Sequence, residues 1–226
     1  MRLLFLSLWL SLCLALASVP AATACPCSQF DKDAPDPGHL DSAGGLQFSR
    51  SGEFRKEFRA RTREARAFVR DYLKKNPDKT RLAIVSDIDE TLIDNRGYFD
   101  NHKEFKWSAF FAFIDKADAP SLKDTASFLA YARKQGVAIF LITGRPEKCR
   151  ASTIKNLVHN KIAYDGLYMR PDKNREPAAD VKTRIRKEIE DMGFTIVVNI
   201  GDQVSDLKGG HAEDCEKLPN RLYHVK

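Results

Sequence analysis

Short apolar runs separated by helical patterns constrain the fold of this 226-residue chain more than any other feature. The runs are four to six residues long and cover 82–85, 138–142, 166–169 and 195–200, with a fifth expected at 222–225. Continuous apolar strands are typical of parallel sheets that are buried on both faces. Helical periodicity occupies the intervals at roughly 121–134, 146–160 and 178–192. This alternation predicts an α/β fold in which helices flank a mostly parallel sheet.

The composition fits a globular protein of one ordinary domain, because 43% of the residues are hydrophobic and 30% are charged. The 37 basic residues outnumber the 31 acidic ones. This excess suits an anionic ligand, but it is too diffuse to indicate a nucleic-acid partner. A helix expected at 51–75 carries many arginines on one face, and the acidic residues among them favour a solvated surface.

Residues 1–24 have the three parts of a secretory signal peptide. Arg2 supplies the positive charge, an apolar run extends from Leu3 to Val19, and Ala22-Thr23-Ala24 offers small residues for cleavage. The run is short for a membrane anchor, and no later stretch is apolar for long enough to be a transmembrane span. We therefore expect a soluble protein that is secreted or periplasmic.

Cleavage after this peptide would leave Cys25 at the new N-terminus. A lipoprotein anchored at Cys25 is the alternative to plain export, although Ala22 stands where a lipoprotein signal usually has leucine. Residues 25–50 are rich in Pro, Asp and Gly at their start and predict a flexible N-terminal segment before a domain at 51–226.

The five cysteines are too few for a disulfide-stapled scaffold. In an oxidising compartment Cys149 and Cys215 could pair. Both could equally remain free or buried thiols, and the sequence leaves these alternatives open.

Polar side chains follow three of the predicted strands. Residues 87–91 follow the first strand, residues 143–145 the second and residues 201–206 the fourth. In open parallel sheets, ligands bind beyond the carboxyl ends of the strands. The sequence therefore predicts a polar site at one edge of the sheet, built from segments that are far apart in the chain.

Asp87 and Asp89 are two residues apart, so on an extended chain both side chains point to one side while Ile88 points to the core. Two close carboxylates repel each other unless a cation lies between them or one is protonated. Asp202 and Asp206 add oxygen ligands, which predicts a hard divalent cation such as Mg²⁺. The five histidines show no metal-ligand spacing. With a hydroxyl and a lysine nearby, these groups describe a phosphoryl-transfer site with a carboxylate nucleophile.

The chain resembles the haloacid dehalogenase (HAD) superfamily of phosphatases in Asp87-x-Asp89-x-Thr91, in the strand-terminal Thr143, in a later lysine and in Gly201-Asp202-x-x-x-Asp206. It is similar to the secreted acid phosphatases of subfamily IIIB in the segments DIDET, LITGRPE, GDQVSDLKGG and GGHAEDCEKLPN. That group includes bacterial class B and class C-like enzymes and plant vegetative storage proteins. The resemblance covers about residues 51–225. It implies a Rossmann-like HAD core with a small helical cap inserted after the first strand.

The resemblance implies a role for each residue of the first two motifs. Asp87 would be the nucleophile that forms an aspartyl-phosphate. Asp89 would be the general acid that protonates the leaving oxygen and later activates water, and its backbone carbonyl would bind Mg²⁺. Thr143 would hydrogen-bond the phosphoryl oxygens, beside the backbone of Gly144.

The same resemblance implies a phosphate-binding lysine and a set of metal ligands. Three lysines lie between the third and fourth predicted strands: Lys173, Lys182 and Lys187. Lys182 matches the family position best, and it would neutralise phosphate charge and restrain the nucleophile. Asp202 would be the main metal ligand, together with the nucleophile Asp87 and the Asp89 carbonyl. Asp206 would act more distantly or through water.

The cap is expected at about 95–120, where aromatic residues are frequent. Tyr98, Phe99 and Trp107 are the expected substrate contacts, since rings can stack on a nucleobase or another aromatic leaving group. Phe110, Phe111 and Phe113 are expected to form the cap's own core.

The leading interpretation is an exported, Mg²⁺-dependent acid phosphatase that hydrolyses small phosphomonoesters, such as a nucleotide or an aryl phosphate, through an aspartyl-phosphate. One alternative is a phosphotransferase that passes the phosphoryl group to an alcohol from the same site. Another is a non-catalytic storage or binding protein of the same fold, and the presence of both Asp87 and Asp89 argues against it.

Overall fold

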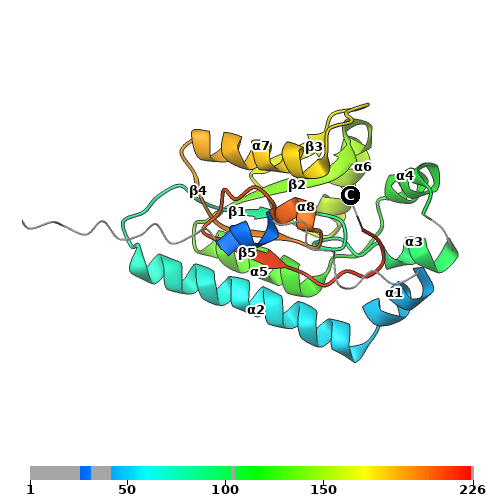
Figure 1. The fold of residues 1–226 in the computed structure, drawn as a ribbon, viewed down its shortest axis with the longest axis horizontal. Helices are drawn as coiled ribbons and strands as arrows, with labels where there is room; N and C mark the ends of the chain where they lie inside the picture. The colour runs from blue at the N-terminus through cyan, green and yellow to red at the C-terminus, as the bar shows by residue number, and fades with distance from the viewer. Residues whose placement is uncertain (1–25, 32–41, 103–104, 225–226) are drawn as a thin grey trace, which may run out of the picture.

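The computed structural model describes residues 26–31, 42–102 and 105–224. Within these residues, five strands pair in parallel as one sheet, in the order β3-β2-β1-β4-β5. Their bounds are Leu82–Ser86 (β1), Ala138–Pro146 (β2), Gly166–Arg170 (β3), Thr195–Gly201 (β4) and Asp214–Lys217 (β5). The predicted α/β fold with a parallel sheet is confirmed, and β1 lies at its centre (Figure 1).

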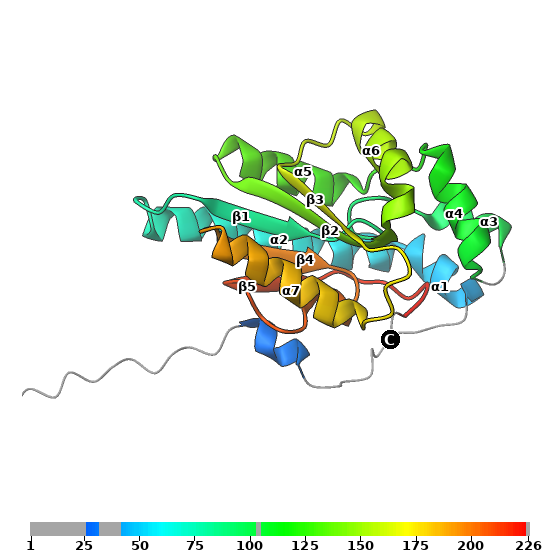
Figure 2. The ribbon, with the colours of Figure 1, turned by 90° about the horizontal axis from the view of Figure 1, so that it is seen from above.

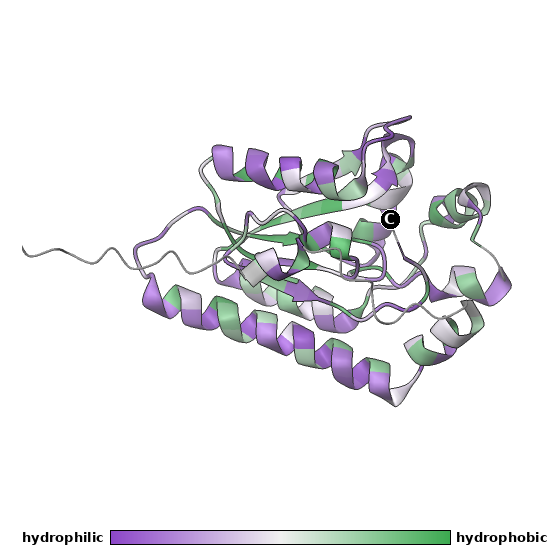
Figure 3. Ribbon diagram, viewed as in Figure 1, coloured by the Kyte–Doolittle hydropathy of each residue, from purple (hydrophilic) through white to green (hydrophobic). Residues whose placement is uncertain are grey.

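The hydrophobic core is divided between the two faces of the sheet, because successive strand residues point to opposite sides. Ile84 packs on one face with α2 (Gly52–Lys75) and α5 (Lys123–Lys134). Val85 packs on the other face with α7 (Ala178–Asp191). Figure 2 shows helices on both sides of the sheet, and Figure 3 shows hydrophobic strands between helices with hydrophilic outer faces.

Local sequence signals set the ends of α2. The Ser51 hydroxyl accepts a hydrogen bond from the Phe54 N–H at 3.0 Å and caps the first turn. The helix ends at Lys75, just before the Asn76-Pro77 pair. The connection between β2 and β3 consists of a short 3₁₀ turn, η2 (Glu147–Cys149), followed by α6 (Arg150–His159).

Two short helices follow β1 where the sequence predicts a cap. They are α3 (Arg96–Asn101) and α4 (Trp107–Lys116), and they pack around the fully buried ring of Tyr98. Figure 1 places both helices beyond the carboxyl ends of β1 and β2.

The fifth strand is β5 at 214–217, and the prediction of a strand at 222–225 was wrong. The β5 sequence, DCEK, is too polar to stand out, yet it pairs with the end of β4. Within the described part of the expected strand, residues 222–224 form no strand. Leu222 instead packs in the buried group around Tyr98, here called the cap cluster, with Phe99, Phe110 and Ile114.

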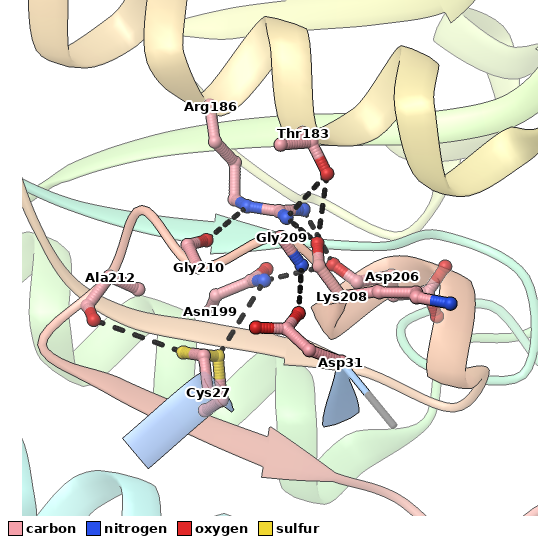
Figure 4. The surroundings of a disulfide bond; sticks show 11 residues. Cys27, Asp31, Thr183, Arg186, Asn199, Asp206, Lys208, Gly209, Gly210 and Ala212 are labelled. Carbon is pink, nitrogen blue, oxygen red and sulfur yellow. Dashed lines mark hydrogen bonds between the residues drawn. A yellow bond between two sulfur atoms is a disulfide. The ribbon is translucent and has the colours of Figure 1, made fainter. Parts of the chain in front are cut away.

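Cys215 pairs with Cys27, with the two Cα atoms 5.2 Å apart, and not with Cys149 (Figure 4). Cys149 is a buried free thiol that packs in the cap cluster, whereas Cys215 packs with α7 on the opposite side of the sheet. The Cys149–Cys215 pairing is therefore wrong, because the two cysteines lie on different sides of the sheet.

The described parts of the N-terminal segment differ from the expected flexible chain. Pro26–Phe30 forms a 3₁₀ helix, η1, which the disulfide joins to β5. Asp31 continues this attachment, since its carboxylate accepts a hydrogen bond from the Gly209 N–H at 2.8 Å (Figure 4). Ser42–Ser49 forms α1, which contacts α2 and α3.

None of the helices in the described ranges is long and apolar enough to cross a bilayer. The predicted signal peptide at 1–24 and the alternative lipid site at Cys25 lie outside the described residues.

Glu216 of β5 provides a test of the packing between β5 and α2. Its side chain is 7% exposed, and burial raises its pKa to about 8, with a further rise from the nearby Asp214 and Glu64 carboxylates and a smaller opposing effect of Arg61. The unfolded chain releases this proton near pH 4.3. The free energy of unfolding should therefore fall as the pH rises from about 4.5 to 8.

We expect Glu216→Gln to raise the melting temperature at pH 8. At pH 4 it should leave the melting temperature nearly unchanged, because the Glu216 carboxyl is then mostly protonated in both the native and the unfolded chain. Scanning calorimetry at the two pH values measures this difference. Glu57→Gln, which removes an exposed carboxylate of α2, is the control and should show no such pH dependence. Equal melting temperatures for wild type and Glu216→Gln at pH 8 would contradict the assignment.

Candidate active site

The carboxyl ends of β1, β2 and β4 bring the predicted polar residues to one place. Asp87 follows β1 directly, and its N–H donates to the Ile200 carbonyl of β4 at 3.0 Å. Ile88 is fully buried in the core, so Asp87 and Asp89 point together toward the sheet edge, as the alternation predicts. Asp202 follows β4 in the same way.

The short helix α8 (Val204–Leu207) carries Asp206 back toward β4. The close approach depends on Gly201, because a Cβ at this position would lie 2.4 Å from the Asp206 carboxylate. The Asp206 carboxylate also accepts a hydrogen bond from the Gln203 N–H at 2.8 Å, which closes the turn.

Lys182 of α7 bridges two of the aspartates. Its ammonium donates to Asp87 at 2.6 Å and to Asp206 at 2.5 Å, and all three side chains are less than 9% exposed. Burial alone would lower the pKa of Lys182, but the Asp206 and Asp87 carboxylates outweigh it and hold the pKa above its ordinary value. Lys182 is therefore a permanent cation in this site.

Three donors surround the fully buried carboxylate of Asp202. The Thr91 hydroxyl donates at 2.9 Å to one oxygen, and the Gln203 and Asn220 amides each donate at 2.6 Å to the other. Burial raises the pKa of Asp202 to about 6, and the nearby Asp206 carboxylate adds to the rise against the two amide hydrogen bonds.

The carboxylates of Asp87, Asp202 and Asp206 can hold a metal ion. One oxygen of each lies within 4.8 Å of the others, and all three residues are buried. Burial also raises the pKa of Asp87 well above its ordinary value, with further contributions from the neighbouring carboxylates against the charge of Lys182. A bound cation would relieve this repulsion, and a set of hard oxygen ligands fits a divalent ion.

Arg145 holds Asp89 away from this group. Its guanidinium donates to the Asp89 carboxylate at 2.7 and 3.0 Å, and the Asn95 amide adds a donor at 2.7 Å. Arg145 is 3% exposed and also donates to Thr153 at 3.2 Å. The two aspartates of the first motif are therefore held by different cations, Asp87 by Lys182 and Asp89 by Arg145.

Thr143 and Gly144 lie at the end of β2 beside Asp89. The Thr143 hydroxyl is buried and accepts a hydrogen bond from the Arg145 N–H at 3.1 Å. Gly144 lines the cavity described below and leaves open space where a side chain would stand.

A cavity of about 450 Å³ lies over the aspartates and reaches the cap. Asp87, Asp89 and Lys182 are among the residues that line it. Five aromatic residues also line it and are here called the aromatic wall: Phe105, Trp107, Phe110, Phe111 and Tyr223. The cavity thus has both charged and aromatic lining residues.

The cap residues divide differently from the sequence-based expectation. Trp107 lines the cavity and is 59% exposed, as a substrate contact requires. Tyr98 does not line it, because its hydroxyl bonds to the Lys106 backbone and its ring stacks on His102 inside the cap. Phe99 is buried as well and stacks on Tyr223.

The assignment of Tyr98 and Phe99 to substrate contact was therefore wrong. Phe110 and Phe111, which were expected only in the cap's core, line the cavity, whereas Phe113 does not. Helix α4 explains the difference, because Trp107, Phe110, Phe111 and Ile114 recur at the spacing of one helix face, and that face lines the cavity. Phe113 lies off this face and packs on the Tyr98 ring.

Several site residues escaped the sequence analysis: Glu90, Asn95, Arg145, Asn220 and Tyr223. Arg145 lies inside the LITGRPE segment. The sequence marks it only as an arginine that follows the Thr143-Gly144 pair near the end of a predicted strand. Asn95 and Asn220 bond to Asp89 and Asp202 through tertiary structure, which no local pattern reveals. Glu90 and Tyr223 bond to each other, a contact between distant segments that is equally hidden in the sequence.

The site combines an acidic cluster, a bridging lysine and a helical cap at the carboxyl edge of a parallel sheet, which is the arrangement that the motifs predict. Residues 46–226 match the family described as HAD superfamily, subfamily IIIB (Acid phosphatase). The chain therefore belongs to subfamily IIIB of the HAD superfamily, as its motifs indicate.

Two plant proteins are similar in sequence. Acid phosphatase 1 of Solanum lycopersicum is 32% identical over 66% of this chain and 61% of its own length. The Stem 28 kDa glycoprotein of Glycine max is 30% identical over 77% of this chain and 70% of its own length. The chain thus spans less than two thirds of the tomato protein.

The class C acid phosphatase from Bacillus anthracis has a similar solved structure. The two superpose with a TM-score of 0.66 over 81% of this chain and 85% of the other, at 21% identity. This similarity supports the fold.

Proposed function

We propose that the protein is an exported, Mg²⁺-dependent phosphomonoesterase of the acid phosphatase kind that acts through an aspartyl-phosphate. The observation that carries the proposal is the Lys182 ammonium, which bonds to both Asp87 and Asp206 beside a cavity with room for a small ester. Membership of the acid phosphatase subfamily supports the same reaction.

In the first half of the reaction, an Asp87 oxygen attacks phosphorus and the bond from phosphorus to the leaving oxygen breaks. Asp89 gives its proton to that oxygen, so that an alcohol leaves. Arg145 and Asn95 fix the position of the Asp89 carboxyl for this transfer. Lys182 would offset the charge of the phosphoryl group, and Thr143 with the Gly144 backbone would bind its oxygens.

In the second half, the Asp89 carboxylate takes a proton from water, which attacks phosphorus and releases inorganic phosphate and free Asp87. A divalent cation held by Asp87, Asp202 and the Asp89 carbonyl, with Asp206 nearby, would supply charge stabilisation for the transferred group. We assign this cation as Mg²⁺ because the available ligands are carboxylate and carbonyl oxygens.

The aromatic wall favours a phosphomonoester with a planar aromatic leaving group, such as a nucleotide or an aryl phosphate. Trp107 contributes an exposed ring, and the Lys148 ammonium lies 4.0 Å from the Phe111 ring centre at the same wall. Rings of this kind stack on a base or an aryl group.

Two observations support export. The Cys27–Cys215 disulfide is typical of proteins that fold in an oxidising compartment. The sequence of residues 1–24 has the parts of a signal peptide.

The catalytic proposal is tested by Asp87→Asn, which keeps the shape of the side chain and removes its nucleophilicity. We expect turnover of an aryl phosphate to fall by roughly 10⁴-fold or more, on the scale of nucleophile removal in other enzymes. Circular dichroism should show an intact fold, and Asp191→Asn on the exposed face of α7 should retain full activity.

The same assay is repeated after chelation and after return of Mg²⁺. Hydrolysis at the wild-type rate by Asp87→Asn, or by the metal-free enzyme, would refute the corresponding part of the mechanism. Product analysis with an added alcohol distinguishes hydrolysis from phosphotransfer, because the second reaction forms a new phosphomonoester. A folded wild-type protein without turnover would favour the storage or binding alternative.

The substrate proposal is tested by Trp107→Ala. Stacking on a base contributes about 1–3 kcal/mol, so kcat/KM for a nucleotide or aryl phosphate should fall by about tenfold. Glycerol phosphate has no ring and should be hydrolysed nearly as before. Met192→Ala, an exposed apolar side chain after α7, is the control. Equal losses on both substrates would show that Trp107 supports the cap and contacts no leaving group.

The export proposal is tested by the intact mass of the mature protein. Cleavage of the expected signal peptide predicts a chain that begins at or next to Cys25. One disulfide makes its mass lower by two hydrogens than that of the reduced chain. An added acyl mass would instead establish the lipoprotein alternative, and a retained Met1 would exclude cleavage.

A further inference from the structure

The segment that follows β5, residues 218–224, contacts the active site although its motif has no assigned role. We call it the post-β5 segment. It begins at the catalytic edge of the sheet, where the Leu218 N–H donates to the Gly201 carbonyl at 2.8 Å and the Leu218 side chain is fully buried. Each contact described next joins this segment to a different part of the site.

Asn220 joins the segment to the main expected metal ligand. Its amide nitrogen donates to an Asp202 oxygen at 2.6 Å, and its carbonyl oxygen accepts from the Leu222 N–H at 2.7 Å. The side chain is 5% exposed. One amide therefore both closes a turn of the segment and fixes the direction of the Asp202 carboxylate.

Tyr223 joins the segment to the loop that carries Asp89. Its hydroxyl donates to Glu90 at 2.6 Å, and the other Glu90 oxygen accepts from the Asn95 N–H at 3.0 Å. Asn95 in turn donates to Asp89 at 2.7 Å. Glu90 has a φ of +55°, a conformation that few non-glycine residues adopt. Its N–H donates to the Ile93 carbonyl at 2.9 Å, and the two hydrogen bonds above fix its carboxylate.

Helix α1 holds the post-β5 segment from outside. A Cβ on Gly45 would lie 2.2 Å from the Arg221 carbonyl oxygen, so the helix backbone packs directly on the segment. The Arg221 guanidinium lies 3.7 Å from the centre of the Phe48 ring. The segment is thus fixed between α1 on one side and the site on the other.

We propose that the post-β5 segment is a positioning element of the active site: Asn220 orients Asp202 for the metal ion, and the Tyr223 hydroxyl fixes the Glu90 turn that carries Asp89. This inference rests on the proposed Mg²⁺-dependent phosphatase function. Neither side chain takes part in bond making. Both act through the carboxylates that they hold.

The Asn220 contact is tested by Asn220→Ser. A serine hydroxyl can still accept from the Leu222 N–H and keep the turn, but it is too short to reach Asp202. Removing a partner of a metal ligand typically weakens metal binding by about 10–100-fold. We therefore expect the Mg²⁺ dissociation constant, measured by titration calorimetry without substrate, to rise by about tenfold. Asn101→Ser makes the same substitution at an exposed position of α3 and should leave Mg²⁺ affinity unchanged.

The Tyr223 contact is tested by Tyr223→Phe, which removes the hydroxyl and retains the ring of the aromatic wall. We expect kcat for an aryl phosphate to fall by about tenfold, the scale of a lost hydrogen bond to a charged group, while KM is unchanged. Tyr223→Leu should raise KM as well, because it also removes the ring. A purely structural role would lower the melting temperature and leave both kcat of the folded enzyme and Mg²⁺ affinity at wild-type values.

The outcomes separate this inference from the proposed function. Wild-type protein that neither binds Mg²⁺ nor hydrolyses phosphomonoesters would refute the function and the inference with it. Active wild type, with Asn220→Ser binding Mg²⁺ as tightly as wild type and Tyr223→Phe retaining kcat, would refute the inference alone. Weaker Mg²⁺ binding in Asn220→Ser but not in Asn101→Ser would support it.

Discussion

A single ammonium group joins three elements of the candidate active site. Lys182 comes from α7, Asp87 from the end of β1 and Asp206 from α8, and the lysine lies within 2.6 Å of both carboxylates. Removing a partner from a buried charge cluster is costly, because the remaining charges are neither solvated nor paired. The packing of α7 on the sheet is therefore a condition for the acidic cluster. Arg186 reinforces it one turn later by donating to the Asp206 carbonyl at 2.7 Å (Figure 4).

Different surroundings allow two neighbouring aspartates to serve different purposes. Asp87 lies among other carboxylates beside a lysine, where burial and repulsion favour a cation. Asp89 lies only two residues away, but the planar guanidinium of Arg145 donates hydrogen bonds from two nitrogens to its carboxylate and fixes the orientation of that group. In the proposed mechanism, environment more than residue type would therefore set which carboxylate attacks and which moves a proton.

The sequence predicted the parts of the fold and site that depend on local pattern. Apolar runs identified β1, β2, β3 and β4. Asp87 and Asp202 directly follow their strands, and Thr143 lies in the last four residues of β2, at the same edge of the sheet. It could not identify β5, whose four residues are mostly polar, or the Cys27 pairing, which depends on how η1 lies against the sheet. The cap rings were misassigned because an aromatic run does not reveal which face of a short helix meets a cavity.

The disulfide makes the order of events during synthesis part of the folding problem. Cys27 and Cys215 are 188 residues apart, so the correct bond forms only after nearly all of the described chain has been made. Cys149 emerges earlier and is a competing thiol until it is buried among the cap side chains. Early burial of Cys149 removes this competitor, and thiol exchange converts a wrong bond into the native link. The 3₁₀ helix η1 is therefore fixed to the sheet only after β5, at the edge of the sheet, has paired with β4.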